Sequence, residues 1–119
     1  MITLERELER LDGIWDAAAS DAFEAYLETA PSEPVALAAA LIEVALRLQR
    51  LGGTVPPAGD LLRADLCLAR ASRLLAETRD RRLQVAFARA IEDQAAAAAE
   101  GRALSLLRAA LLEACRTGR

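Results

Sequence analysis

The sequence predicts an all-α fold, a compact bundle of about five helices that forms a single domain over residues 1–119. Hydrophobic residues make up 54 % of the chain but aromatic residues only 3 %, so Leu and Ala must build the core. Both are strong helix formers, whereas the β-branched and aromatic residues that favour strands are sparse. A chain of 119 residues is long enough for one hydrophobic core.

The first expected helix runs from Ile2 to about Thr29 and repeats its apolar residues at alternating spacings of four and three. The residues at this spacing are Leu4, Leu8, Leu11, Trp15, Ala18, Ala22 and Ala25. Such a seam is typical of coiled coils, so its first four members are the predicted interaction residues. Gly13 lies off the seam, and the pattern leaves open whether the helix continues through it.

The second expected helix runs from Glu33 or Pro34 to Leu51, with Ser32 as its N-cap. Glu43 and Arg47 are four residues apart in the favourable order for an ion pair. The rest of this helix is almost entirely apolar, so we expect it to be the most buried element. The pair Gly52-Gly53 is expected to end it.

Three further helices are expected in the second half of the chain. Asp60 is the predicted cap of a helix that ends near Thr78, and Asp80 is the predicted cap of a helix that ends near Glu100. The last helix spans about residues 102–116. The expected core face of the helix after Asp60 consists of Leu61, Leu62, Leu68, Ala71, Leu74 and Leu75.

The composition argues against an enzyme. The chain has no His, and all of its basic residues are Arg, so the commonest general base, the commonest metal ligand and any catalytic Lys are missing. Asp65 near the apolar face is read as an ion-pair partner for an Arg, because a metal site needs several converging carboxylates. We therefore expect no catalytic residue, no metal site and no cofactor.

The charge pattern indicates a protein partner. The net charge is −3, so nucleic acid is not an expected partner. Residues 1–33 are strongly acidic, whereas residues 34–119 carry more Arg than acid, which is consistent either with ordinary solvated helix faces or with two docking surfaces of opposite charge. The most apolar stretch is interrupted by Glu43, Arg47 and Arg50, which argues against a membrane span.

Cys67 and Cys115 are isolated and are read as buried thiols in a reducing compartment. The first residues lack the basic-then-apolar order of a signal peptide. Both features favour a cytoplasmic location.

Three segments resemble the trans-isoprenyl diphosphate synthases, also called polyprenyl synthetases. The segment Ala64–Glu77, A-D-L-C-L-A-R-A-S-R-L-L-A-E, is similar to a Gly-Asp-containing helix of that family, with Asp65 at the Asp and Ala64 in place of the Gly. The segment Ile91–Gly101 is similar to the family's next helix, and Ala39–Glu43 to the start of the helix that leads into its first aspartate-rich motif. The resemblance covers about residues 35–105.

The departures from that family are equally specific. Where the family carries its first aspartate-rich motif, this chain has Leu51-Gly52-Gly53-Thr54, and the segment that grips diphosphate is missing. The resemblance therefore implies a non-catalytic short form, similar to the small subunit of a two-component prenyl diphosphate synthase. Such a subunit binds a catalytic subunit and helps to set the product chain length.

Two alternatives remain from the residues themselves. One is a self-associating helical scaffold, and the other is a small helical protein that binds a hydrophobic ligand in its Leu/Ala core. The long first seam cannot be covered by one shorter helix of the same chain, so we expect a homodimer when the protein is alone.

Overall fold

A computed structural model describes residues 17–50, 53–101 and 107–117, and in these residues the backbone forms five α-helices and no strand. The predicted all-α fold is therefore confirmed. The helices are α2 (Ala17–Leu27), α3 (Glu33–Gln49), α4 (Ala58–Glu77), α5 (Arg81–Ala99) and α6 (Leu107–Thr117).

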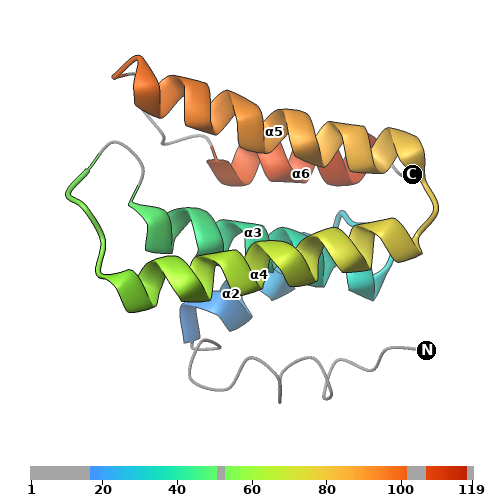
Figure 1. The fold of residues 1–119 in the computed structure, drawn as a ribbon. Coiled ribbons are helices and arrows are strands. Elements are labelled where there is room, and N and C mark those ends of the chain that lie inside the picture. The colour runs from blue at the N-terminus through green and yellow to red at the C-terminus, as the bar shows by residue number, and fades with distance from the viewer. Residues whose placement is uncertain (1–16, 51–52, 102–106, 118–119) are drawn as a thin grey trace.

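Helix α3 lies at the centre of the arrangement (Figure 1). It packs against α2, most extensively against α4, and against α6. Helices α5 and α6 run antiparallel as a pair, and α5 makes only sparse contact with α4, although the two follow each other in the chain. The α5–α6 pair is therefore joined to the rest of the bundle mainly through α6 and α3.

The central position of α3 follows from its sequence. All residues from Val35 to Glu43 are buried, and the run contains four Ala residues that allow neighbouring helices to approach closely. The prediction that this is the most buried helix is confirmed. Buried residues from the other four described helices join those of α3 in one core, which includes Phe23, Leu74, Phe87 and Leu111.

Two of the three predicted N-caps are confirmed. Ser32 Oγ accepts a hydrogen bond from the Val35 backbone N–H at 3.4 Å, and Asp80 Oδ1 accepts one from the Leu83 N–H at 3.1 Å. Each side chain satisfies an amide that the first turn of a helix leaves without a partner.

The prediction that Asp60 caps its helix is wrong. Helix α4 begins at Ala58, two residues earlier, and Pro57 stands at the N-cap without a side-chain bond. The Pro57 carbonyl accepts hydrogen bonds from the backbone amides of Asp60 and Leu61. The Asp60 carboxylate, inside the first turn, forms ion pairs with Arg50 and Arg63, both at 3.5 Å.

The end of α3 also differs from the prediction. The helix ends at Gln49, and Arg50 adopts the left-handed conformation with φ of 49°. Its N–H bonds to the Arg47 carbonyl at 3.2 Å, so the helix ends before the expected Gly52-Gly53 pair. Helix α5 ends at Ala99, and Gly101, two residues further on, adopts the left-handed conformation with φ of 72°.

The predicted core face of α4 is partly wrong. Leu61 and Leu62 are exposed, whereas the buried residues of this helix are Ala64, Cys67, Ala71, Leu74 and Leu75. The contact with α3 runs along a line of residues spaced three and four apart, beginning at Ala64. Leu62 lies on the opposite side of the helix from this line, so its size and apolar character do not bring it into the core.

The first predicted seam is described only in part. Leu4, Leu8, Leu11, Trp15 and Gly13 lie outside the described residues. Within α2, the predicted seam residue Ala18 is exposed, and the buried side chains are those of Ala19, Ala22, Phe23 and Tyr26. The face of α2 that packs into the core therefore includes the predicted seam residue Ala22 and the neighbouring Phe23 and Tyr26, but not Ala18.

Candidate functional site

The most unusual buried group in the described part of the chain is the carboxylate of Glu43 on α3, because only 2 % of this residue is exposed. Tyr26 of α2 donates its hydroxyl to Glu43 Oε1 at 2.8 Å. Arg47, one turn further along α3, places Nη2 at 2.8 Å from Oε2. The predicted ion pair between Glu43 and Arg47 is confirmed.

Arg108 of α6 completes the surroundings of Glu43. Its Nε donates to Oε1 at 2.9 Å and its Nη2 to Oε2 at 2.8 Å, which is a two-point contact between the planar guanidinium and the carboxylate. Arg108 Nη1 also lies 3.5 Å from Asp21 Oδ2 of α2, and the guanidinium carbon lies 6.0 Å from the centre of the Tyr26 ring.

The electrostatics of the Glu43 group follow from these contacts. Burial by itself raises the pKa of Glu43, but the hydrogen bonds from Arg108 and Tyr26 and the positive charges of Arg47 and Arg108 outweigh burial, so the net pKa is lowered. Burial and the adjacent carboxylate raise the pKa of Tyr26. The hydrogen bonds to Glu43 raise the pKa of Arg108. The carboxylate is therefore held ionised and the phenol neutral.

This network is suited to holding helices together rather than to acid–base chemistry. Both oxygens of Glu43 are engaged by donors from three helices, and the depressed pKa makes the carboxylate a poor base near neutral pH. Of these contacts with Glu43, only the one with Arg47 is predictable from the sequence, because the two residues are four apart on one helix. Tyr26 and Arg108 lie 17 and 65 residues away from Glu43 in the chain, and no local pattern signals such pairings.

An apolar groove lies between α4 and α5, where the two helices make sparse contact. It has a volume of about 210 Å³ and is lined by Ile42, Leu68, Ala71, Ser72, Leu75, Gln84, Phe87, Ala88 and Ile91. Gln84 donates to the Leu75 carbonyl at 3.1 Å and thereby bridges the two helices at this groove. Pockets for drug-sized ligands typically measure about 300–1,000 Å³, so this groove is small for a lipid.

The side of α4 that faces away from α3 carries exposed apolar side chains. Leu62 is 71 % exposed and Leu66 is 38 % exposed, one turn apart. Ala69 and Ala76 continue this line along the helix. We call the exposed residues Ala58, Leu62, Asp65, Leu66, Ala69, Ser72, Arg73 and Ala76 the outer face of α4.

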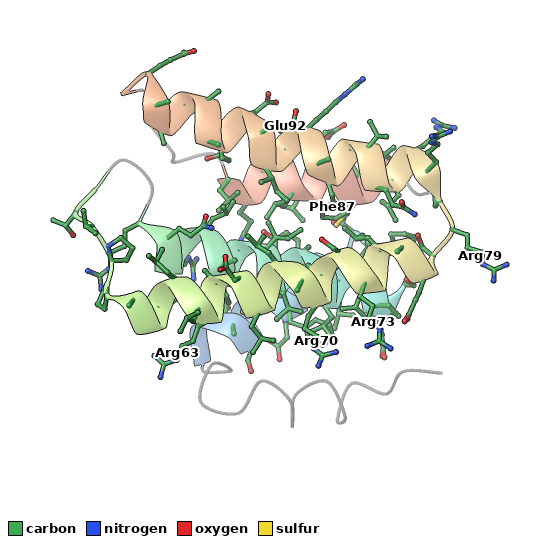
Figure 2. The ribbon with its side chains drawn as sticks, viewed as in Figure 1. Arg63, Arg70, Arg73, Arg79, Phe87 and Glu92 are labelled. Carbon is green, nitrogen blue, oxygen red and sulfur yellow. The ribbon has the colours of Figure 1, made fainter. Side chains whose placement is uncertain are left out.

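Arg residues collect along α4 and at the start of α5. Figure 2 shows Arg63, Arg70 and Arg73 along one edge of α4 and Arg79 at the turn into α5. A shallow hollow of about 390 Å³ is lined by Arg81, Arg82, Arg89 and Thr117 together with two apolar residues. These groups give the second half of the molecule its positive charge, as the sequence indicates.

Asp65 and the two cysteines are the other residues that the sequence singles out. Asp65 is exposed on the outer face of α4, away from the residues that pack against α3, so the prediction that it lies on or near the core-facing apolar side is wrong. Within the described ranges, no group of three or more potential ligands is arranged to hold a metal ion. Cys67 and Cys115 are buried free thiols, as predicted, and burial raises the pKa of each to about 11.

None of the described helices is both long and apolar enough to cross a membrane. Comparison of the chain with protein-family models, with curated proteins and with solved structures found no match.

Proposed function

We propose that this chain is a non-catalytic helical subunit that binds and regulates a catalytic prenyl diphosphate synthase. The observation that carries the proposal is the outer face of α4. This face exposes Leu62 and Leu66 on α4, the helix whose segment Ala64–Glu77 resembles the Gly-Asp helix of the synthase family. Exposed large apolar side chains in a contiguous line are typical of a surface that meets another protein.

The order of the helices supports the proposal. The three segments that resemble the family fall on α3, α4 and α5, which are consecutive in the chain. The segment Ala39–Glu43 lies inside the buried run of α3, and Ile91–Gly101 covers the second half of α5 and its end. The resembling segments thus lie almost entirely within helices rather than in loops.

The Arg side chains on and beside the outer face favour a protein partner over a lipid. Arg63 and Arg73 have more than half of their side chains exposed, and both lie on the edge of α4 (Figure 2). A partner helix with an apolar line bordered by acidic residues fits this arrangement. The α4–α5 groove, at about 210 Å³, supports the hydrophobic-ligand alternative less well.

Two further parts of the proposal concern the state of the protein. When no synthase is present, a second copy of the chain covers the apolar surface, which makes the protein a homodimer. The protein works in the cytoplasm, where reducing conditions keep Cys67 and Cys115 as thiols.

Co-purification tests the proposal. The tagged chain is co-expressed with a synthase from the same cell that carries both aspartate-rich motifs, and the two are expected to elute together. Leu62→Glu places a charge on the outer face and is expected to abolish co-elution. Val85→Glu is the matched control, because Val85 is also a partly exposed apolar residue but lies on α5. Failure of the wild-type chain to retain the synthase contradicts the proposal, and so does equal loss in both variants.

A further inference from the structure

Helix α4 carries apolar side chains on two sides, and only one of these sides is covered by α3. The covered face consists of Ala64, Cys67, Ala71 and Leu74, with Leu75 beside them. The outer face lies on the other side of the same helix. It contains the seam Ala58, Leu62, Asp65, Ala69, Ser72 and Ala76, all of which are exposed.

The spacing of this seam is that of a coiled coil. Its members alternate four and three residues apart without interruption over the whole of Ala58–Glu77. Five of the six seam residues, all but Asp65, are apolar or small, and such residues at this spacing allow a second helix to follow the first along its length. The twenty residues of α4 span about 30 Å at 1.5 Å each, so a partner helix can pair over several turns.

We propose that a second copy of this chain covers the outer face of α4, with the two α4 helices antiparallel around a two-fold axis at Ala69. In this register Ala69 meets Ala69 of the second copy, and Leu62 meets Ala76 at both ends. Small residues at the axis permit the helix backbones to approach closely, and each Leu fills the space above an Ala. In a two-fold interface the contact on the axis occurs once and every contact away from the axis occurs twice, as in this register.

Charge complementarity favours this register. Asp65 and Arg73 lie four residues before and four residues after Ala69 on the same face. An antiparallel pair therefore places Asp65 of each copy next to Arg73 of the other. Both residues are exposed. A parallel pair in register instead places Arg73 of one copy beside Arg73 of the other, and these like charges repel each other.

Reversal of the two charges tests the pairing. Sedimentation equilibrium is expected to give twice the 12.8 kDa of one chain for the wild-type protein at micromolar concentration. Asp65→Arg alone and Arg73→Asp alone each bring like charges together and are expected to shift the mass toward that of one chain. The double variant restores opposite charges and is expected to recover the dimer. A wild-type mass that stays near 12.8 kDa overturns the inference, and so does a double variant that does not recover.

Cross-linking gives an independent measurement on the same surface. Ala69→Cys places a thiol at the proposed axis, while Cys67 and Cys115, the only native cysteines, are buried. Mild oxidation is expected to convert this variant to a disulfide-linked dimer within the same time in which Glu92→Cys, on the exposed side of α5, stays largely monomeric. Equal cross-linking of the two variants, or none in Ala69→Cys, contradicts the proposed axis.

This inference rests on the proposed self-association and not on the synthase. A chain that dimerises through α4 but does not bind a synthase contradicts only the proposed function. A monomeric chain that does bind a synthase contradicts only the two-fold pairing.

Discussion

Arg108 of α6 grips the buried carboxylate of Glu43 of α3 at two points, with contacts of 2.9 Å and 2.8 Å across 65 residues of sequence. This pair joins the α5–α6 hairpin to the helices that precede it. The backbones of α4 and α5 make sparse contact, so the Arg108–Glu43 pair adds a polar link from α6 to the apolar contacts that α5 makes with the core.

Replacement of Arg108 by Met is expected to destabilise the protein by about 3 kcal/mol, since it leaves the Glu43 charge buried with fewer partners. The Met side chain retains much of the apolar volume of the Arg side chain. Arg116→Met is the matched control on the same helix, because Arg116 pairs with Glu113 at the surface, and an exposed pair contributes below about 1 kcal/mol. Denaturant unfolding measures both values. Equal losses of unfolding free energy in the two variants would contradict the prediction that the buried Arg108 contact contributes more than the exposed Arg116 pair.

The Glu43 network also predicts a dependence of stability on pH. The pKa of Glu43 is lowered from its usual 4.5 in the folded state, so the unfolded chain binds its proton more readily. The stabilisation is therefore fully present above the unfolded pKa and is lost as the pH falls through the lower folded pKa. Comparison with Glu43→Gln isolates this group from the other carboxylates.

The difference in unfolding free energy between wild type and Glu43→Gln is expected to be largest near neutral pH and to shrink below about pH 4. Chemical unfolding at a series of pH values measures it. A difference that stays constant from about pH 7 down to about pH 3 would contradict a lowered pKa in the folded state.

The two cysteines are expected to be unreactive while the protein is folded. Burial raises the pKa of both thiols to about 11, and the thiolate is the reactive form. A coloured disulfide reagent should therefore modify neither thiol in the native protein and both after unfolding. Cys67→Ala and Cys115→Ala should each cost about 1 kcal/mol, less than the 2–5 kcal/mol typical of a lost disulfide. Rapid labelling of the native protein would argue against their buried positions.

The chain alone is expected to show no Mg²⁺-dependent prenyl transfer. Residues 51–54 contain no carboxylate at the place where the family it resembles carries its first aspartate-rich motif, and Mg²⁺ is bound in proteins mainly through carboxylates. The assay combines the chain with an allylic diphosphate, isopentenyl diphosphate and Mg²⁺. Product above the protein-free blank would contradict this prediction.

The helices were largely predictable because their signals are local. Ser32 and Asp80 stand directly before apolar runs and bond to amides three residues ahead, so short-range spacing is enough to find such caps. Asp60 is an aspartate like Asp80, but it lies two residues after the first residue of α4 instead of directly before the helix. The helix has already begun at Asp60, because the Pro57 carbonyl accepts hydrogen bonds from the amides of Asp60 and Leu61. Asp60 therefore does not act as a side-chain cap.

The orientation of α4 and the partners of Glu43 were not predictable in the same way. Both sides of α4 carry apolar residues at helical spacing, so the spacing alone does not show which side faces the core. Contact with α3 buries Cys67, whereas Leu62 stays exposed. Arg108 is one of fifteen Arg residues, and nothing near it in sequence marks it as the partner of Glu43. Both outcomes depend on tertiary packing.

The product distribution of a catalytic prenyl diphosphate synthase, with and without this chain, tests the central claim most directly. The synthase is assayed with isopentenyl diphosphate and an allylic starter while the chain is added in increasing amounts, and Leu62→Glu serves as the control. The account predicts a saturable shift in product chain length with the wild-type chain and none with the variant. An unchanged product length and rate at a large excess of the wild-type chain would contradict it.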